Sequence, residues 1–392
     1  MVLGTGAACR GGGGGGDPDA GVEDGGGSDG GTVEGWRWKA CPLHTDDIWG
    51  KQAECAMIPV PLDWADPEGP SIEIFVKRLK TEGTSRGQLW LLQGGPGGSG
   101  AVYEVFQEQF AQIDGNWDTY AIDHRGVGKS ARLGCPQEAA TANKPFGLAP
   151  EDFEACLASL QAEWGEDLAH FNITNAAKDL EHLIAETRAP GEQVFLYGAS
   201  YGTTWAHRYL QLDPEPIDGV ILDSLAINIF FTDFDAYFNQ VGEDFLALCT
   251  ADTDCNTKVG GDAWGAVGLA LDAIEAGSCS ELGLDRKHAR WFFAELLMNV
   301  ATRDLIPAIA HRIQRCEAGD VAAIEQLRGV LAGFMPDYLR ELDSRSLGLN
   351  IIASEFWPLY PTDAHHLQWA ATDLPVLILQ GDLDPQTPHW VA

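Results

Sequence analysis

The sequence predicts an α/β fold in which a mostly parallel central sheet is flanked by helices and interrupted by an inserted helical cap. Short apolar runs alternate with amphipathic helical segments over residues 72–222, and such alternation is typical of a parallel sheet. A mainly helical stretch, residues 227–373, then separates these units from one more apolar run, Pro375–Gln380. A sheet that resumes after a long helical stretch indicates an insertion.

Strands are expected where short runs of apolar or alternating residues stand between turn residues. Ile72–Leu79 alternates with a period of two, and the other expected strands are the largely apolar runs Gln88–Leu92, Thr119–Ile122, Gln193–Tyr197 and Gly219–Leu222. The last run, Pro375–Gln380, has the pattern of a buried strand.

Two helices are expected next to these strands. Asn175–Thr187 places apolar residues on one side of a helix, and a second helix covers Thr203 to about Leu212. Together these elements divide the chain into four parts, which are a start and linker at 1–35, the first part of the sheet domain at 36–226, the cap at 227–373 and the return of the sheet domain at 374–392.

The charge balance excludes one class of partner. The 392 residues contain 25 Lys plus Arg against 58 Asp plus Glu, which gives a formal net charge of -33. A phosphate backbone is repelled by such a field, so nucleic acid is not an expected partner.

The nine cysteines predict disulfides rather than a metal site. Eight of them form pairs that are close in sequence, and there is no CxxC motif and no Cys/His cluster with zinc-ligand spacing, so no metal or other cofactor is expected. Disulfides indicate an oxidising compartment, whereas the alternative is buried free thiols in a cytosolic enzyme. The expected pairs are Cys41–Cys55, Cys135–Cys156, Cys249–Cys255 and Cys279–Cys316.

The N-terminal stretch predicts an extracytoplasmic protein. Met1–Cys9 is similar to the end of a secretory signal, and the small residues before Cys9 resemble a bacterial lipobox, in which the cysteine is lipidated. Residues 10–35 are rich in Gly and Asp and are expected to form a flexible tether. We therefore expect a secreted or cell-envelope lipoprotein, with membrane attachment through Cys9 as one possibility and a plain disordered start as the other.

The strongest chemical signal is the motif GASYG at residues 198–202, which lies between an expected strand and an expected helix. A tight turn in this position exposes the hydroxyl of Ser200 at the N-terminus of a helix, where the helix dipole favours negative charge. Ser200 is therefore the candidate nucleophile. The alternative is a glycine-rich strand-to-helix turn with no chemical role.

A second glycine-rich stretch, Gln93–Gly98, follows an earlier expected strand. Acyl transfer needs N–H donors aimed at a developing oxyanion, and glycines let a backbone approach closely. The candidate donors are the backbone N–H groups of Gly95 and Tyr201. Alone, such a loop fits a plain turn or a phosphate cradle equally well.

The candidate acid is Asp384, which follows the last apolar run. An acid at the carboxyl edge of the sheet can orient a catalytic histidine. Asp382 is the rival candidate, and the alternative for both is a structural role in a turn.

These motifs resemble a known family. The stretches QGGPGGSG, DHRGVGKS, GASYG and GDLDPQTP are similar in order and spacing to those of the α/β-hydrolase peptidases, which include proline iminopeptidases and the secreted tripeptidyl aminopeptidases of actinobacteria. The resemblance covers residues 36–392. It implies the α/β-hydrolase fold, a peptide substrate, and release of residues or short peptides from its N-terminus. Gln93 stands where many relatives have His, and Asp123 and Arg125 match a segment that is structural.

The resemblance also implies a histidine a few tens of residues after the acid, beyond one further strand. Only eight residues follow Asp384, His389 is five residues past it, and His365 and His366 precede the last apolar run. We therefore expect the last strand and helix to be missing and the chain to be inactive as written. It is either a fragment of a normal enzyme or a non-catalytic relative.

An aminopeptidase needs a carboxylate for the α-ammonium group of its substrate, and Glu355 and then Glu243 are the candidates in the cap. Solvated surface carboxylates are the alternative for both. Two other functions remain open, namely an esterase or lipase with the same triad and a lipoprotein that only binds peptides.

Overall fold

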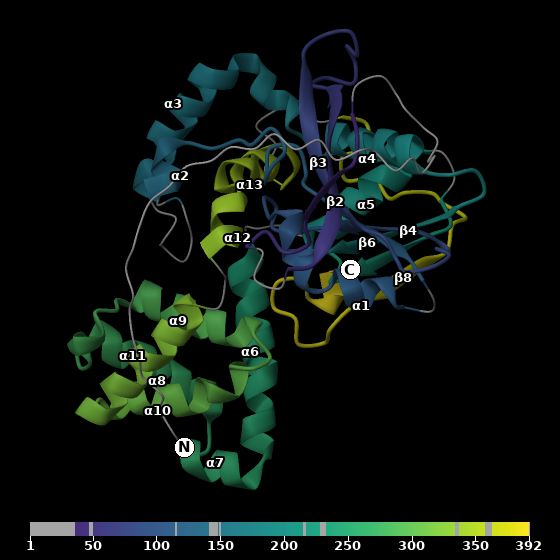
Figure 1. Cartoon of the computed structure of the whole chain (residues 1–392). Helices are drawn as coiled ribbons and strands as arrows, with labels where there is room; N and C mark the ends of the chain where they lie inside the picture. Colours follow the sequence, from purple (N-terminus) through teal and green to yellow (C-terminus); the bar gives the residue numbers. More distant parts are fainter. Residues whose placement is uncertain are drawn as a thin grey trace, which may run out of the picture.

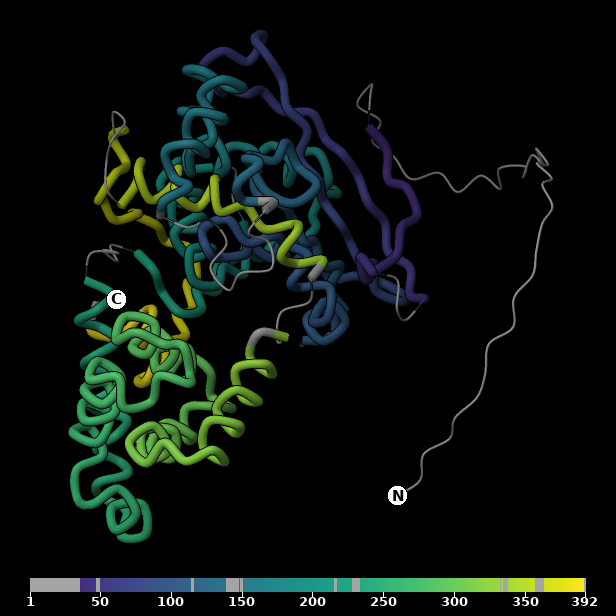
Figure 2. The backbone as a smooth tube through the Cα atoms, turned by 90° about the vertical axis from the view of Figure 1, so that its left-hand side faces the viewer, coloured from purple at the N-terminus to yellow at the C-terminus, as the bar shows by residue number. Residues whose placement is uncertain are grey.

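The structure is a computed structural model that describes residues 36–46, 50–113, 116–140, 148, 150–214, 217–227, 233–333, 337–356 and 363–391. Cys9 and residues 10–35 lie outside the described residues. The views show a unit built around a sheet and a separate cluster of helices (Figures 1 and 2). No helix in these described ranges combines the length and apolar character needed to cross a membrane.

The sheet has eight strands in the order β1-β2-β3-β5-β4-β6-β7-β8. The pairs β1–β2, β2–β3 and β3–β5 are antiparallel, and β4, β5, β6, β7 and β8 run parallel. This mostly parallel sheet confirms the predicted fold class. The strands are β1 Lys39–Pro42, β2 Gln52–Pro61, β3 Ser71–Leu79, β4 Gly87–Leu92, β5 Asp118–Ile122, β6 Gln193–Ala199, β7 Gly219–Asp223 and β8 Val376–Leu379.

Side chains alternate along each strand, and both faces of the sheet are covered around β4. Trp90 of β4 packs in the main core with residues of α4 (Ile173–Thr187) and α5 (Tyr201–Gln211). Leu89 and Leu91 face the other way, into a smaller cluster that includes Tyr103. That face is covered by η1 (Gly100–Val105) and α1 (Gln107–Ala111).

The parallel register brings two loops to the same edge of the sheet. Leu92, the last residue of β4, is paired with Gly198 near the end of β6. The loop after β4 and the turn after β6 therefore start side by side, and these are the two glycine-rich segments that the sequence singles out.

Along the chain, a group of helical elements lies between β5 and α4. It consists of α2 (Pro136–Ala140), η2 (Pro150–Asp152), α3 (Phe153–Trp164) and η3 (Gly165–His170). Phe171 and Leu168 anchor this group in the main core.

The helical cluster has a hydrophobic core of its own. Buried residues from Val241 to Ile324 form this core, separate from that of the sheet unit. The cluster, which we call the helical unit, contains α6 Phe234–Ala251, α7 Thr253–Val259, α8 Ala263–Glu275, η5 Ser280–Leu282, α9 Arg286–Met298, η6 Arg303–Leu305, α10 Ile306–Arg315 and α11 Ala318–Ala332.

The residues after this unit do not belong to it, which differs from the expected cap at 227–373. The elements α12 (Asp337–Leu342), α13 (Arg345–Ile351) and the single π-turn η7 (Ile352–Phe356) follow α11. Leu347 and Ile351 are fully buried in the core of the sheet unit. Figures 1 and 2 both show α13 beside the sheet unit and apart from the helical unit.

The structure joins all four expected cysteine pairs, with S–S distances of 1.97–2.08 Å. Cys41–Cys55 links β1 to β2, and Cys135–Cys156 ties α3 to the segment before α2. The other two bridges lie inside the helical unit.

The last strand differs from its prediction. The run around Val376–Leu379 was expected to be buried, but β8 is the last strand of the sheet and pairs with β7 alone. Its four side chains are 39–53% exposed. An apolar run has the same pattern at an edge as in the centre of a sheet, so the sequence could not separate the two. The element η8 (His389–Val391) follows.

Candidate active site

Ser200 occupies a strained turn between β6 and α5. Its backbone has φ 54° and ψ -124°, a conformation that costs a non-glycine residue about 1–3 kcal/mol. The Ser200 N–H donates to the carbonyl oxygen of Asp223 at the end of β7, at 2.9 Å. The neighbouring strand therefore holds the turn, and Ser200 stands at the N-terminus of α5.

The two glycines of the GASYG motif are explained by close backbone contacts. A Cβ on Gly198 would lie 2.3 Å from the carbonyl oxygen of Gly202. A Cβ on Gly202 would lie 2.1 Å from the carbonyl oxygen of Leu92. Neither position has room for a side chain, so the start of α5 can pack directly against the end of β4.

The loop after β4 lies against the nucleophile. A Cβ on Gly94 would come within 2.8 Å of the Cβ of Ser200 and 3.2 Å of the backbone N of Tyr201. Gly95 follows with φ +116°, a conformation that favours glycine, and it is exposed. The structure thus brings the loop of Gly95 beside Ser200 and the N–H of Tyr201.

Buried Asp123 supports this loop from below. Its carboxylate accepts hydrogen bonds from Ser99 Oγ at 2.6 Å, from the Gly100 N–H at 2.9 Å and from the Lys129 N–H at 2.8 Å. Burial raises the pKa of Asp123, and these three donors oppose that shift. Asp123 therefore holds the end of the glycine-rich loop against β5, in line with its expected structural role.

Arg125 has a structural position as well. Its guanidinium makes two bonds to the carboxylate of Asp179 on α4, with Nε–Oδ2 at 2.7 Å and Nη2–Oδ1 at 2.6 Å. It also donates to the carbonyl oxygens of Leu62 and His170. These bonds tie β5 to α4 and to the strand layer.

His124 is a neighbour of the turn that the sequence reasoning missed. It is buried, and its Nε2 lies 3.3 Å from the hydroxyl of Tyr201. Its Nδ1 lies 2.6 Å from the carbonyl oxygen of Arg125. Burial lowers the pKa of His124 to about 4, so its ring is neutral at physiological pH. It packs against the turn of Ser200 through its contact with Tyr201. The DHRG segment next to a buried strand was the only signal for it.

The two candidate acids differ in their surroundings. Asp384 is half-buried, and its carboxylate accepts from Thr387 Oγ1 at 2.6 Å and from the N–H groups of Gln386 and Thr387 at 2.9 and 3.2 Å. The side chain of Asp382 is 92% exposed and lies 3.9 Å from Nδ1 of His389. The carboxylate of Asp384 is therefore held within its own turn, as the structural alternative expects, whereas that of Asp382 is exposed.

The histidines near the end of the chain make other contacts. In the part of the chain that the structure describes, His366 Nε2 lies 2.6 Å from the carbonyl oxygen of Glu355. His207 on α5, which the sequence did not single out, accepts at Nε2 from the N–H of Ala370 at 2.9 Å. His389 lies beside Asp382. The rings of these histidines are thus engaged with groups other than Ser200 and Asp384.

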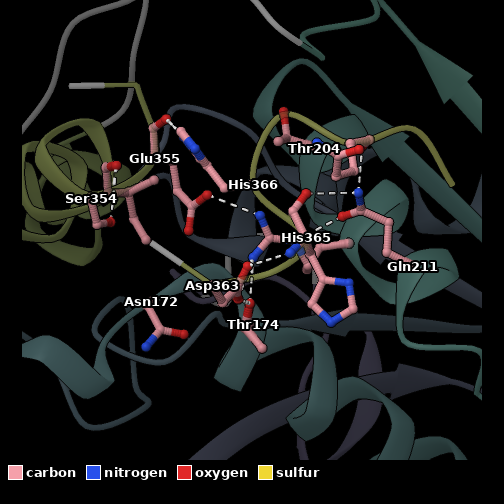
Figure 3. Close-up of polar contacts among 12 residues, drawn as sticks. Asn172, Thr174, Thr204, Gln211, Ser354, Glu355, Asp363, His365 and His366 are labelled. Carbon is pink, nitrogen blue, oxygen red and sulfur yellow. Dashed lines mark hydrogen bonds and ion pairs between the residues drawn. The ribbon is translucent and has the colours of Figure 1, made fainter. Parts of the chain in front are cut away.

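Glu355 lies at a pocket farther along α5. Its carboxylate is 12% exposed and lies 3.0 Å from Nη2 of Arg208. Nη1 of the same guanidinium lies 3.2 Å from Oδ2 of Asp363. Burial raises the pKa of Glu355, and the charge of Arg208 opposes that shift. Figure 3 shows Glu355, Asp363, Thr174 and His366 in one polar cluster. Glu355 shares the guanidinium of Arg208 with Asp363.

The pocket lies between α5, η7 and residues 365–368, and its polar lining includes His207, Gln211 and His366. Glu243 is at another place, exposed on α6 of the helical unit. The structure does not bring the two candidate ammonium-binding carboxylates together.

The sequence was compared with known proteins. Relatives include a tripeptidyl aminopeptidase of Streptomyces lividans, 33% identical over 209 residues, which are 48% of this chain and 38% of that protein. The serine protease Hip1 of Mycobacterium tuberculosis is 28% identical over 187 residues, which are 44% of this chain and 35% of that protein. The chain thus matches well under half of the length of these relatives.

The solved structures that the chain matches include a proline iminopeptidase of Mycobacterium smegmatis, with 15% identity, a TM-score of 0.38 and coverage of 85% of this chain and 83% of that one. An esterase of Thermogutta terrifontis has 13% identity, a TM-score of 0.40 and coverage of 85% and 82%. Residues 89–392 match the family described as alpha/beta hydrolase fold. The chain therefore belongs to the α/β-hydrolase fold family.

Proposed function

We propose that this protein is a serine peptidase that releases single residues or short peptides from the N-termini of peptide substrates. The observation that carries the proposal is the strained turn at Ser200, with the glycine-rich loop of Gly94 packed against it. The similarity to a tripeptidyl aminopeptidase and to a serine protease supports a peptide as the substrate.

In the proposed reaction, Ser200 Oγ attacks the carbonyl carbon of the scissile bond while an imidazole base takes the hydroxyl proton. The C–N bond then breaks, the amine leaves with that proton, and an acyl-enzyme remains on Ser200. The negative charge that develops on the carbonyl oxygen is received by the N–H groups of Gly95 and Tyr201, at the positive end of α5. The adjacency of Gly94 to both Ser200 and Tyr201 supports this assignment. Water then releases the acyl group.

The proposed acid is Asp384, whose task is to orient an imidazole base. The rings of His207 and His366 are bonded elsewhere. We therefore propose that residues 1–392 alone hydrolyse substrate several orders of magnitude more slowly than an enzyme with a complete triad. Imidazole added in solution is expected to replace part of the missing base.

The proposed setting is extracytoplasmic. The four disulfides support an oxidising compartment. Lipidation of Cys9 stays a prediction, because Cys9 lies outside the described residues. The roles of Glu355 and Glu243 in binding the substrate ammonium also stay predictions, and the ion pair of Glu355 with Arg208 means that an ammonium group would have to compete with a guanidinium.

The proposal is tested with aminoacyl and tripeptidyl p-nitroanilides next to p-nitrophenyl esters, with and without imidazole. We expect anilide cleavage that rises with imidazole concentration and disappears in Ser200→Ala. Ester hydrolysis that is faster than with Ser200→Ala at the same imidazole concentration, without anilide cleavage, would identify an esterase. A protein that binds peptides while neither substrate class is cleaved, even with imidazole, would be a non-catalytic relative.

A further inference from the structure

We propose that residues 337–356, the segment that returns from the helical unit, clamp the glycine-rich loop onto the turn of Ser200, and that Asp343 is the positioning residue of this clamp. Within this segment the sequence singled out Glu355 alone, as a candidate for binding the substrate ammonium. Its effect on catalysis rests on the proposed function, in which the loop supplies an oxyanion donor.

The first evidence is a pair of hydrogen bonds between the segment and the loop. The N–H of Ser99 donates to Oδ1 of Asp343 at 2.9 Å. In the other direction, the N–H of Ser344 donates to the carbonyl oxygen of Gly97 at 2.8 Å. Each side therefore donates one hydrogen bond to the other, although Ser99 and Asp343 are 244 residues apart in sequence.

The second evidence is direct backbone packing. A Cβ on Gly97 would lie 2.1 Å from the carbonyl oxygen of Ser344. A Cβ on Gly348 would lie 2.7 Å from the carbonyl oxygen of Pro96. Both surfaces lack side chains where they meet, which lets α13 touch the loop backbone just after Gly95.

The segment is itself fixed to the sheet unit, so it can act as a support. Ser344 Oγ donates to the carbonyl oxygen of Leu133 at 2.6 Å, and the N–H of Arg345 donates to Glu138 at 2.5 Å. Leu347 and Ile351 are buried in the main core. Ser99 is thus held from two sides, through its hydroxyl by Asp123 and through its N–H by Asp343.

The other end of the same segment meets the nucleophile helix. Glu355 in η7 pairs with Arg208 of α5, at 3.0 Å. The helix α5 begins at Tyr201, whose N–H is the second proposed oxyanion donor. One continuous segment therefore contacts both the loop that contains Gly95 and the helix that begins at Tyr201. We infer that it sets the distance between the two N–H donors.

The clamp is tested by hydrogen–deuterium exchange at the amides of residues 97–100 in the full protein. Asp343→Ala removes the acceptor for the Ser99 N–H, and we expect exchange in the loop to rise by about tenfold or more through local opening. Asp343→Asn keeps an acceptor oxygen and should restore slow exchange. Unchanged exchange in Asp343→Ala would overturn the clamp.

A matched control is Asp320→Ala in α11. Asp320 is also a buried carboxylate, but it pairs with Arg312 and Arg315 inside the helical unit. This variant should lose stability without any change in loop exchange. If Asp320→Ala and Asp343→Ala raise exchange at residues 97–100 equally, the effect is general destabilisation, and the proposal is contradicted.

The catalytic consequence is measured as the rate of Ser200 labelling by a fluorophosphonate in the presence of imidazole. Asp343→Ala should slow labelling by about 10- to 100-fold, because a small misplacement of a donor loses most of its stabilisation. Faster exchange in the loop of Asp343→Ala together with an unchanged labelling rate of Ser200 would overturn the positioning role of Asp343. If the wild-type protein is not labelled at Ser200, the proposed function fails, and the exchange measurement still decides whether the clamp exists.

Discussion

The backbone of Ser200 is held in its strained conformation by neighbours that have no side chains. Gly198 and Gly202 permit backbone contacts that any larger residue would block, and the N–H of Ser200 bonds to the end of β7. The strain cost is offset by the surrounding structure, which keeps the serine hydroxyl at the helix N-terminus. This is why a five-residue motif was enough to predict the turn.

Gly202→Ala provides a test at this scale. The added Cβ would meet the carbonyl oxygen of Leu92 at 2.1 Å, so β4 or α5 must shift, and we expect a loss of about 1–3 kcal/mol in the free energy of unfolding. The control is Gly268→Ala in α8, where no atom lies within 4 Å of the new Cβ. That change should stabilise the protein by about 0.5–1 kcal/mol.

Urea denaturation measures both variants. Equal stability of Gly202→Ala and the wild-type protein would show that the turn is less tightly packed than these contacts require.

Other features of the site depend on residues that are far apart in sequence. The sequence does not show that Glu355 pairs with Arg208, because the two residues are 147 positions apart. The contact of His124 with Tyr201 is also long-range, at 77 residues. Local patterns predict turns and helices, whereas such pairs exist only once the sheet has brought its edges together.

At the scale of elements, the sequence predicted the central strands well and the edge poorly. β4 and β5 are buried throughout, as expected for strands covered on both faces. In β6, buried residues alternate with partly buried ones. The run at Val376–Leu379 has the same composition but is exposed. Whether helices cover a strand depends on the whole fold, so a run of four apolar residues cannot predict it.

The disulfides of the helical unit give a test at this scale. Cys279–Cys316 closes a loop of 37 residues and Cys249–Cys255 one of 6 residues. Loop-closure entropy predicts a cost of about 4 kcal/mol for replacing the first pair by serine and about 2 kcal/mol for the second. Urea denaturation under non-reducing conditions measures the difference. Equal stability of both double variants and the wild-type protein would argue against disulfides in the folded chain, and with them against an oxidising compartment.

At the scale of the whole molecule, the parallel register explains how distant motifs meet. The loop after β4 and the turn after β6 leave the same edge of the sheet because Leu92 pairs with Gly198. The helical unit has a core of its own. Residues 337–356, which were expected in the cap, differ from that expectation, because Leu347 and Ile351 lie in the core of the sheet unit. Helical composition alone cannot tell which core buries them.

The central claim is that Ser200 is a nucleophile poised by its turn and by the loop around Gly95. The most direct measurement is labelling by a fluorophosphonate, read by mass spectrometry of the modified peptide, with and without imidazole. The account predicts slow modification of Ser200 that accelerates with imidazole and is absent in Ser200→Ala. Modification at another residue, or no modification of Ser200 even at high imidazole concentration, would contradict it.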